Sequence, residues 1–96
     1  MKKIEEIKDM LAEHKHELRE EFKVKEMGVF GSYVRGKQKK TSDVDILVDV
    51  GRITLLKFIE LENYLSDLIG VKVDLIMKTA LKPRIGKHIL KEVRYI

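Results

Sequence analysis

The sequence contains no cysteine and only one proline, Pro83, among its 96 residues. Without cysteine the chain can form neither a disulfide nor a thiolate metal site. It also contains a single glutamine and a single asparagine, Gln38 and Asn63, although 38% of its residues are charged. This charged and amide-poor composition is typical of proteins from heat-adapted organisms.

Long apolar runs are missing as well, so no segment is long enough to cross a bilayer, and none resembles a signal peptide. We therefore expect a cytoplasmic protein. A length of 96 residues predicts one domain, spanning residues 1–96, with a single modest core. No second domain is expected to hold a large substrate, so a large substrate would supply part of the site itself.

The net charge is only +4, from 20 basic and 16 acidic residues. Most of these charges alternate along the expected helix faces, where they keep the domain in solution. The composition therefore does not indicate direct binding to nucleic acid. One local cluster is basic without any acid before Asp43, and it consists of Arg35, Lys37, Lys39 and Lys40.

Apolar residues three or four positions apart predict one continuous amphipathic helix from Ile4 to Phe22. The two histidines in this segment, His14 and His16, have no third ligand nearby. We expect them to be structural or exposed rather than metal ligands, because a zinc site needs several converging ligands.

Two further helices are predicted by their end signals. Thr54 suits the N-cap of a helix that continues to Ile69, and Gly70 suits its C-cap. The single proline, Pro83, suits the first turn of a last helix near the end of the chain.

Three segments have the alternation or β-rich composition of strands: residues 23–30, 42–50 and 71–76. Gly28 in the first of them would allow another backbone to approach closely. The helix between the second and third strands predicts a right-handed crossover that places these strands side by side and parallel. The expected fold is α/β (α+β), with a small mixed three-stranded sheet and helices packed on it.

The connection between the first two strands carries the residues suited to chemistry. Gly31 and Ser32 begin a short helical turn, where unpaired amide groups and the Ser32 hydroxyl favour phosphate binding. Asp43 and Asp45 lie two residues apart at the start of the second strand, so both project from one face and can converge on metal ions. The crossover would bring Asp74 of the third strand beside Asp45. Without that crossover, Asp74 would only be a solubilising residue of an edge strand.

The basic cluster lies between the glycine turn and these carboxylates. Taken alone, a run of positive charge is most often a solvated loop. Here it would supply counter-charge for a triphosphate, and Arg35 can bind phosphate oxygens with two parallel hydrogen bonds.

The spacing of Gly-Ser, ten further residues and then Asp-x-Asp resembles the signature of the DNA polymerase beta-like nucleotidyltransferase superfamily. The resemblance is closest to its minimal nucleotidyltransferase branch, and it extends from Met27 to Tyr95. The fold of the superfamily core agrees with the sheet and helices predicted above. The matching positions are Gly31, Ser32, Arg35, Gly36, Ser42, Asp43, Asp45 and Asp74.

The resemblance implies that Asp43, Asp45 and Asp74 are catalytic and together bind two magnesium ions, with Asp74 nearest the nucleophile. A set of carboxylate oxygens suits magnesium better than zinc. ATP is the implied substrate. The resemblance further implies that the following residues bind the nucleotide: Gly31, Ser32, Arg35 and Ser42.

The same resemblance implies a partner protein. In the minimal branch, the domain is an antitoxin that transfers AMP from ATP to a tyrosine hydroxyl of a HEPN-class toxin. Two other functions remain open from the sequence. The chain could neutralise a partner simply by binding it, or it could modify a small molecule such as an aminoglycoside.

Overall fold

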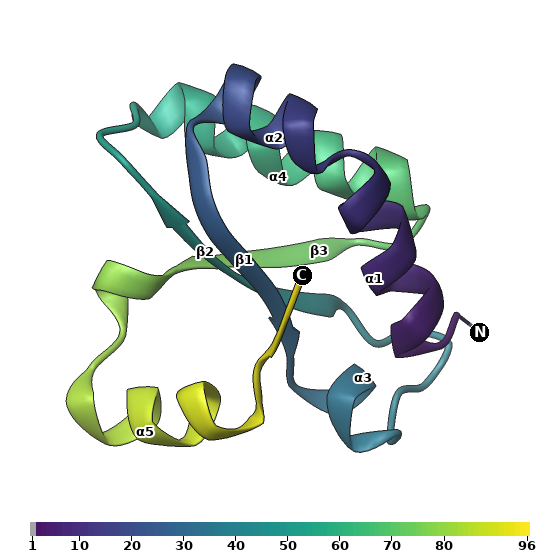
Figure 1. The fold of residues 1–96 in the computed structure, drawn as a ribbon. Helices are drawn as coiled ribbons and strands as arrows, with labels where there is room; N and C mark the ends of the chain where they lie inside the picture. The colour runs from purple at the N-terminus through teal and green to yellow at the C-terminus, as the bar shows by residue number, and fades with distance from the viewer. Residues whose placement is uncertain (1) are drawn as a thin grey trace.

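One mixed β-sheet organises the computed structural model, which describes residues 2–96 (Figure 1). Within these residues the sheet has four strands in the order β3-β2-β1-β4. The central strand β1 runs antiparallel to both β2 and β4, whereas β2 and β3 are parallel. The strands are β1 (Val24–Phe30), β2 (Val44–Val50), β3 (Val73–Met77) and β4 (Arg94–Tyr95).

The predicted α+β class and the parallel crossover are confirmed, but the predicted count of three strands is wrong. The fourth strand, β4, has only two residues, which is too short to show any alternation in the sequence. Its pairing with β1 is set by Gly28 opposite Tyr95 and Val29 opposite Arg94.

Helices cover both faces of the sheet (Figure 1). The N-terminal helices and α4 pack on one face, and α5 packs on the other. No helix within residues 2–96 is both long and apolar enough to span a membrane. The helices are α1 (Ile4–Glu13), α2 (Lys15–Phe22), α3 (Ser32–Arg35), α4 (Leu55–Ile69), the 3-10 helix η1 (Lys78–Ala80) and α5 (Pro83–Glu92).

The first of these helices differs from the expected one, because the continuous helix predicted from Ile4 to Phe22 breaks at His14. The apolar stripe continues across the break, so periodicity gives no sign of it. His14 Nδ1 lies 3.0 Å from the carbonyl oxygen of Met10, and its ring meets Tyr64 edge-on. His14 therefore has a packing role at the junction of α1, α2 and α4.

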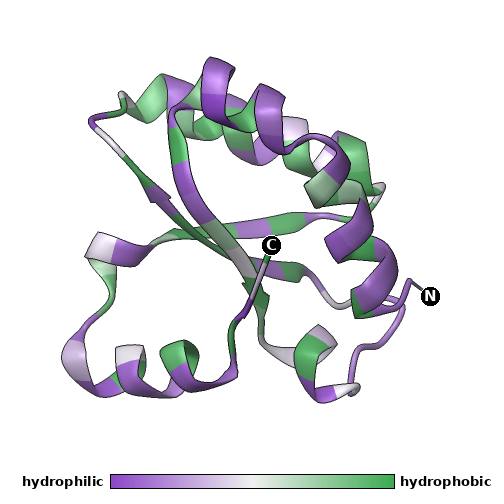
Figure 2. Cartoon of the chain, viewed as in Figure 1, coloured by the Kyte–Doolittle hydropathy of each residue, from purple (hydrophilic) through white to green (hydrophobic). Residues whose placement is uncertain are grey.

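The helix α4 agrees closely with its end signals. The Thr54 hydroxyl accepts a hydrogen bond from the Lys57 amide at 3.1 Å, and Gly70 ends the helix with φ +79°. Hydrophilic and hydrophobic residues alternate along α1, α2 and α4, which matches helices that bury one face (Figure 2). The core they share with the sheet includes Ile7, Leu11, Leu18, Val29, Val44, Ile46, Val48, Leu61, Leu65 and Ile69.

The opposite face of the sheet has a smaller core. It contains Phe30, Leu47 and Ile89, with α5 packed above it. Leu47 and Asp45 share one face of β2, whereas Val44, Ile46 and Val48 belong to the larger core on the other face. The acidic residues of β2 are thus on the side of the sheet that α5 covers.

Gly28 permits the close approach of β4, which confirms the prediction for this residue. A Cβ atom at Gly28 would lie 2.6 Å from Val93 Cγ2 and 3.0 Å from the Arg94 carbonyl oxygen. We expect Gly28→Ala to lower the free energy of unfolding by about 1–3 kcal/mol, because added volume at a packed position forces the backbone to shift.

Urea unfolding measures this effect, with Gly51→Ala as the matched control. The nearest side-chain atom to a Cβ at Gly51 is Lys25 Cε at 4.0 Å. Equal stability of the two variants would contradict the role assigned to Gly28.

Candidate functional site

The glycine turn and the acidic strand meet at one end of the sheet. Phe30, the last residue of β1, pairs with Asp45 of β2, so the following residue Gly31 lies directly beside the Asp45 carboxylate. Gly31 has φ +82° and ψ −150°, a conformation that is essentially restricted to glycine. A Cβ atom there would overlap Asp45 Oδ2 and lie 3.0 Å from Asp45 Cγ. Glycine is therefore required both by the backbone and by the neighbouring carboxylate.

The helix α3 begins at this turn. The amides of Val34 and Arg35 both donate to the Gly31 carbonyl, at 3.1 and 3.2 Å. The amides of Ser32 and Tyr33 precede the first intrahelical bond, and within residues 2–96 no acceptor contacts them. These two donors are positioned to bind an anion beside Asp45.

The predicted carboxylates gather at the same place. Asp45 and Asp74 are register partners of the parallel strands β2 and β3, and Asp43 lies just before β2. Asp43 and Asp45 are half-buried, whereas Asp74 is exposed. The crossover thus brings Asp74 beside Asp45, as the sequence predicted.

Burial, followed by the negative charges of Asp74 and Asp43, raises the pKa of Asp45 from 3.8 to about 6, while Arg35 opposes the shift. Charge repulsion of this kind means that the three carboxylates are close enough to act on one another. A cation placed among them would stabilise the charged form of Asp45.

The donor set is suited to magnesium. Within residues 2–96, no three carboxylate or imidazole groups converge tightly enough to hold a metal ion by themselves. Magnesium is usually bound by one or two carboxylates together with water and substrate phosphates. Asp43 and Asp45, beside the Gly31 turn with its two unpaired amides, fit that mode of binding.

Ser42 contributes to the loop that joins α3 to β2. Its hydroxyl accepts a hydrogen bond from the Lys39 amide at 2.8 Å, and its amide donates to the Lys39 carbonyl. The Tyr33 hydroxyl lies 3.5 Å from the Ser42 carbonyl oxygen. Ser42 therefore orders the residues before Asp43, whereas the lysine side chains of this loop are exposed.

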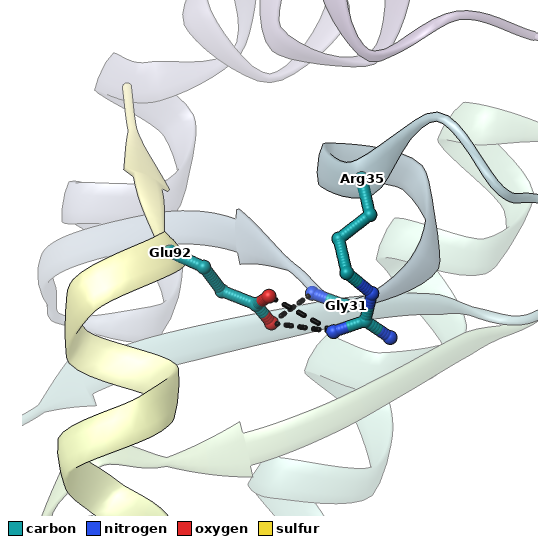
Figure 3. Close-up of polar contacts among 3 residues, drawn as sticks. All are labelled: Gly31, Arg35 and Glu92. Atoms are coloured by element: carbon teal, nitrogen blue, oxygen red, sulfur yellow. Dashed lines mark hydrogen bonds and ion pairs between the residues drawn. The ribbon is translucent and has the colours of Figure 1, made fainter.

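One residue that contacts the candidate site, Glu92 at the end of α5, was not identified from the sequence (Figure 3). The Gly31 amide donates to Glu92 Oε2 at 2.9 Å. Arg35 Nη1 donates to both carboxylate oxygens, at 2.9 and 3.2 Å. The only available sequence signal is that Glu92, the sole acid of α5, lies at the end of the helix where the dipole disfavours negative charge.

A family model described as a nucleotidyltransferase domain matches residues 11–96. A relative from Thermococcus cleftensis, named protein adenylyltransferase MntA, is 61% identical over 94 residues. The alignment covers 97% of this chain and 95% of the relative.

Two solved structures share the fold. The first, described as a candidate minimal nucleotidyltransferase, has a TM-score of 0.73 and 31% identity, and the match covers 92% of this chain and 93% of that one. The second is a tri-AMPylated Shewanella oneidensis HEPN toxin in complex with an MNT antitoxin. It matches with a TM-score of 0.68 and 15% identity, covering 95% of this chain and 69% of that one, and so shows likeness of fold alone. The expected likeness to minimal nucleotidyltransferases is thereby confirmed.

Proposed function

Because the chain belongs to the nucleotidyltransferase domain family and is a nucleotidyltransferase, we propose that it transfers AMP from ATP to a hydroxyl of a protein partner. The observation that carries this proposal is the contact between the Gly31 turn and Asp45, with Asp74 in register beside it. The partner in this proposal is a HEPN-class toxin, the acceptor is a tyrosine, and the protein acts in the cytoplasm as an antitoxin.

In the proposed reaction, the amides of Ser32 and Tyr33 and the guanidinium of Arg35 bind the terminal phosphates of ATP. Asp43 and Asp45 would hold two magnesium ions, which neutralise phosphate charge and stabilise an in-line displacement at the α-phosphorus.

The acceptor hydroxyl approaches from the side of Asp74, the exposed member of the three carboxylates. The acceptor hydroxyl gives up its proton to the Asp74 carboxylate. The hydroxyl oxygen then forms a bond to the α-phosphorus, and the bond from that phosphorus to the oxygen of the β-phosphate breaks. AMP remains on the acceptor, and pyrophosphate leaves.

A protein acceptor is supported by the names of the relatives and by the surface of this chain. The Thermococcus relative is named as a protein adenylyltransferase, and the matched antitoxin was solved in complex with an AMPylated toxin. Leu55 and Leu56 at the start of α4 are 75% and 69% exposed, and Ile85 of α5 is 60% exposed. Exposed apolar side chains of this size are suited to contact with another protein.

The variant Asp74→Asn tests catalysis separately from binding. We expect it to bind the toxin like the wild type, because asparagine has nearly the size and shape of aspartate and Asp74 is not part of the core. Transfer should fall by about a hundredfold or more, since the carboxylate beside the attacking hydroxyl is neutralised. Intact-mass spectrometry of the toxin after incubation with ATP and magnesium measures the added AMP groups.

The matched control is Asp67→Asn, which removes an exposed acid of α4, the helix on the opposite face of the sheet from Asp45, and should leave transfer unchanged. If neither the wild type nor Asp74→Asn adds mass while both suppress the toxin equally, the antitoxin acts by binding alone and the proposed reaction is wrong.

A further inference from the structure

The carboxylate of Glu92 joins two parts of the chain that are 61 residues apart, because it binds both the Gly31 amide and Arg35 (Figure 3). We propose that Glu92 is a positioning residue of the nucleotide site, which holds the glycine turn and the Arg35 side chain ready for phosphate. This role rests on the proposed function, since it assumes that the turn and Arg35 bind ATP.

The location of Glu92 indicates that it serves the site rather than its own helix. A carboxylate in the last turn of a helix lies near the negative end of the helix dipole, which is unfavourable. The other charged residues of α5 are basic, namely Arg84, Lys87 and Lys91.

The segment after α5 also has other attachments to the sheet. Arg94 and Tyr95 of β4 pair with β1, and the Ile96 amide donates to the Met27 carbonyl at 3.0 Å. Glu92 is therefore not needed merely to keep α5 on the sheet.

The first effect of Glu92 is on the backbone of the turn. Glycine is conformationally permissive, so without a partner the peptide group before Gly31 could rotate. The hydrogen bond to Glu92 Oε2 fixes the direction of this amide. The Gly31 amide is then not free to bind phosphate, and the next two amides, of Ser32 and Tyr33, bind it instead. The directions of these two amides follow from the direction of the Gly31 amide.

The second effect is on Arg35, whose side chain is 54% exposed and would otherwise adopt many rotamers. Glu92, only 24% exposed, holds it through Nη1 alone. Arg35 Nη2 and Nε have no hydrogen-bond acceptor within residues 2–96, so these two donors can still bind phosphate oxygens. The charge of Glu92 is meanwhile balanced by the guanidinium, which limits its repulsion of ATP.

Calorimetry with magnesium and a non-hydrolysable ATP analogue tests this role on the chain without its toxin. We expect Glu92→Ala to weaken binding by about tenfold or more, because the charge-assisted hydrogen bonds that orient both groups are lost. Glu92→Gln should recover part of the affinity, since its amide oxygen can still accept from Gly31. Glu60→Gln is the control, because it removes an exposed glutamate charge from the Lys57–Glu60 pair on α4.

A double-mutant cycle with Arg35→Ala distinguishes positioning from general stabilisation. If Glu92 acts through Arg35, Glu92→Ala should weaken binding much less when Arg35 is already alanine. Fully additive effects would overturn the part of the role that concerns Arg35. Thermal unfolding of each variant establishes that it is folded. If Glu92→Ala does not fold, the same comparison is made with Glu92→Gln.

Unchanged binding by both Glu92 variants, with normal binding by the wild type, would overturn the positioning role and leave the proposed function intact. Tighter binding by Glu92→Ala would also overturn it, and would identify Glu92 as an anion that competes with phosphate. Absence of binding by the wild type itself would remove the proposed function together with this role.

Discussion

Asp45→Asn is expected to abolish AMP transfer and, at the same time, to make the nucleotide-free protein more stable at neutral pH. The pKa of Asp45 is raised from 3.8 to about 6, chiefly by burial and then by Asp74 and Asp43. The folded state therefore binds a proton more tightly than the unfolded state does. Stability from this group is fully present below the unfolded pKa and is lost as the pH rises through the folded one.

Asparagine avoids the loss of stability that ionisation of Asp45 causes at higher pH, because asparagine carries no charge. The full pKa shift corresponds to roughly 3 kcal/mol. We expect a gain of about 1–2 kcal/mol in the free energy of unfolding at about pH 7.5, since the carboxylate is still partly solvated. The gain in stability should shrink as the pH falls through about 6 and disappear below about pH 4, where Asp45 is protonated in both the folded and the unfolded wild type.

Urea unfolding of the wild type and Asp45→Asn in the presence of a chelator measures this difference across the pH range. Asp67→Asn, an exposed acid of α4, is the control and should show no comparable pH-dependent gain. A constant difference between Asp45→Asn and the wild type at every pH would contradict the raised pKa.

The loss of activity in Asp45→Asn is expected to reach at least about a hundredfold, because a ligand that places charge at the reacting phosphate is removed. Chelation of magnesium should have the same effect on the wild type. Magnesium-independent transfer by the double variant Asp43→Asn, Asp45→Asn would eliminate the two-metal mechanism.

Gly31→Val is expected to block nucleotide binding altogether, and even Gly31→Ala should impair it severely. A Cβ atom at this position would overlap Asp45 Oδ2 and force the carboxylate away from the turn. The backbone conformation, with φ +82° and ψ −150°, costs a residue other than glycine about 1–3 kcal/mol. Both the phosphate-binding amides and the position of Asp45 would change.

Gly36→Ala provides the matched control. Gly36 also has a positive φ, +68°, but within the described residues no atom outside its immediate neighbours lies within 4 Å of a Cβ placed there. Its alanine variant therefore introduces a side chain at a positive φ without the overlap, in the left-handed helical region that other residues adopt at a lower cost than the Gly31 conformation. Calorimetry with magnesium and the ATP analogue should show near-normal binding by Gly36→Ala and a large loss for Gly31→Ala. If Gly31→Ala and Gly36→Ala bind the ATP analogue with similar affinity, overlap with Asp45 does not explain the effect of the Gly31 variant.

Much of this fold is determined by local features of the sequence. Thr54 and Gly70 bound α4 because a cap depends only on neighbouring backbone groups. Alternation places Val44 and Ile46 on one face of β2 and Asp45 on the other, because successive side chains of a strand project to opposite faces. The helical crossover between the parallel strands β2 and β3 then places Asp74 beside Asp45.

Tertiary structure decides the features that depend on distant contacts. The helix break at His14 cannot be seen in the sequence, because the apolar stripe continues on both sides of it. The strand β4 is defined only by its pairing with β1. The raised pKa of Asp45 comes from burial and from charges on other elements. The bond between Glu92 and the Gly31 amide follows from the packing of α5 on the sheet, and no spacing along the chain encodes it, because 61 residues separate the two groups.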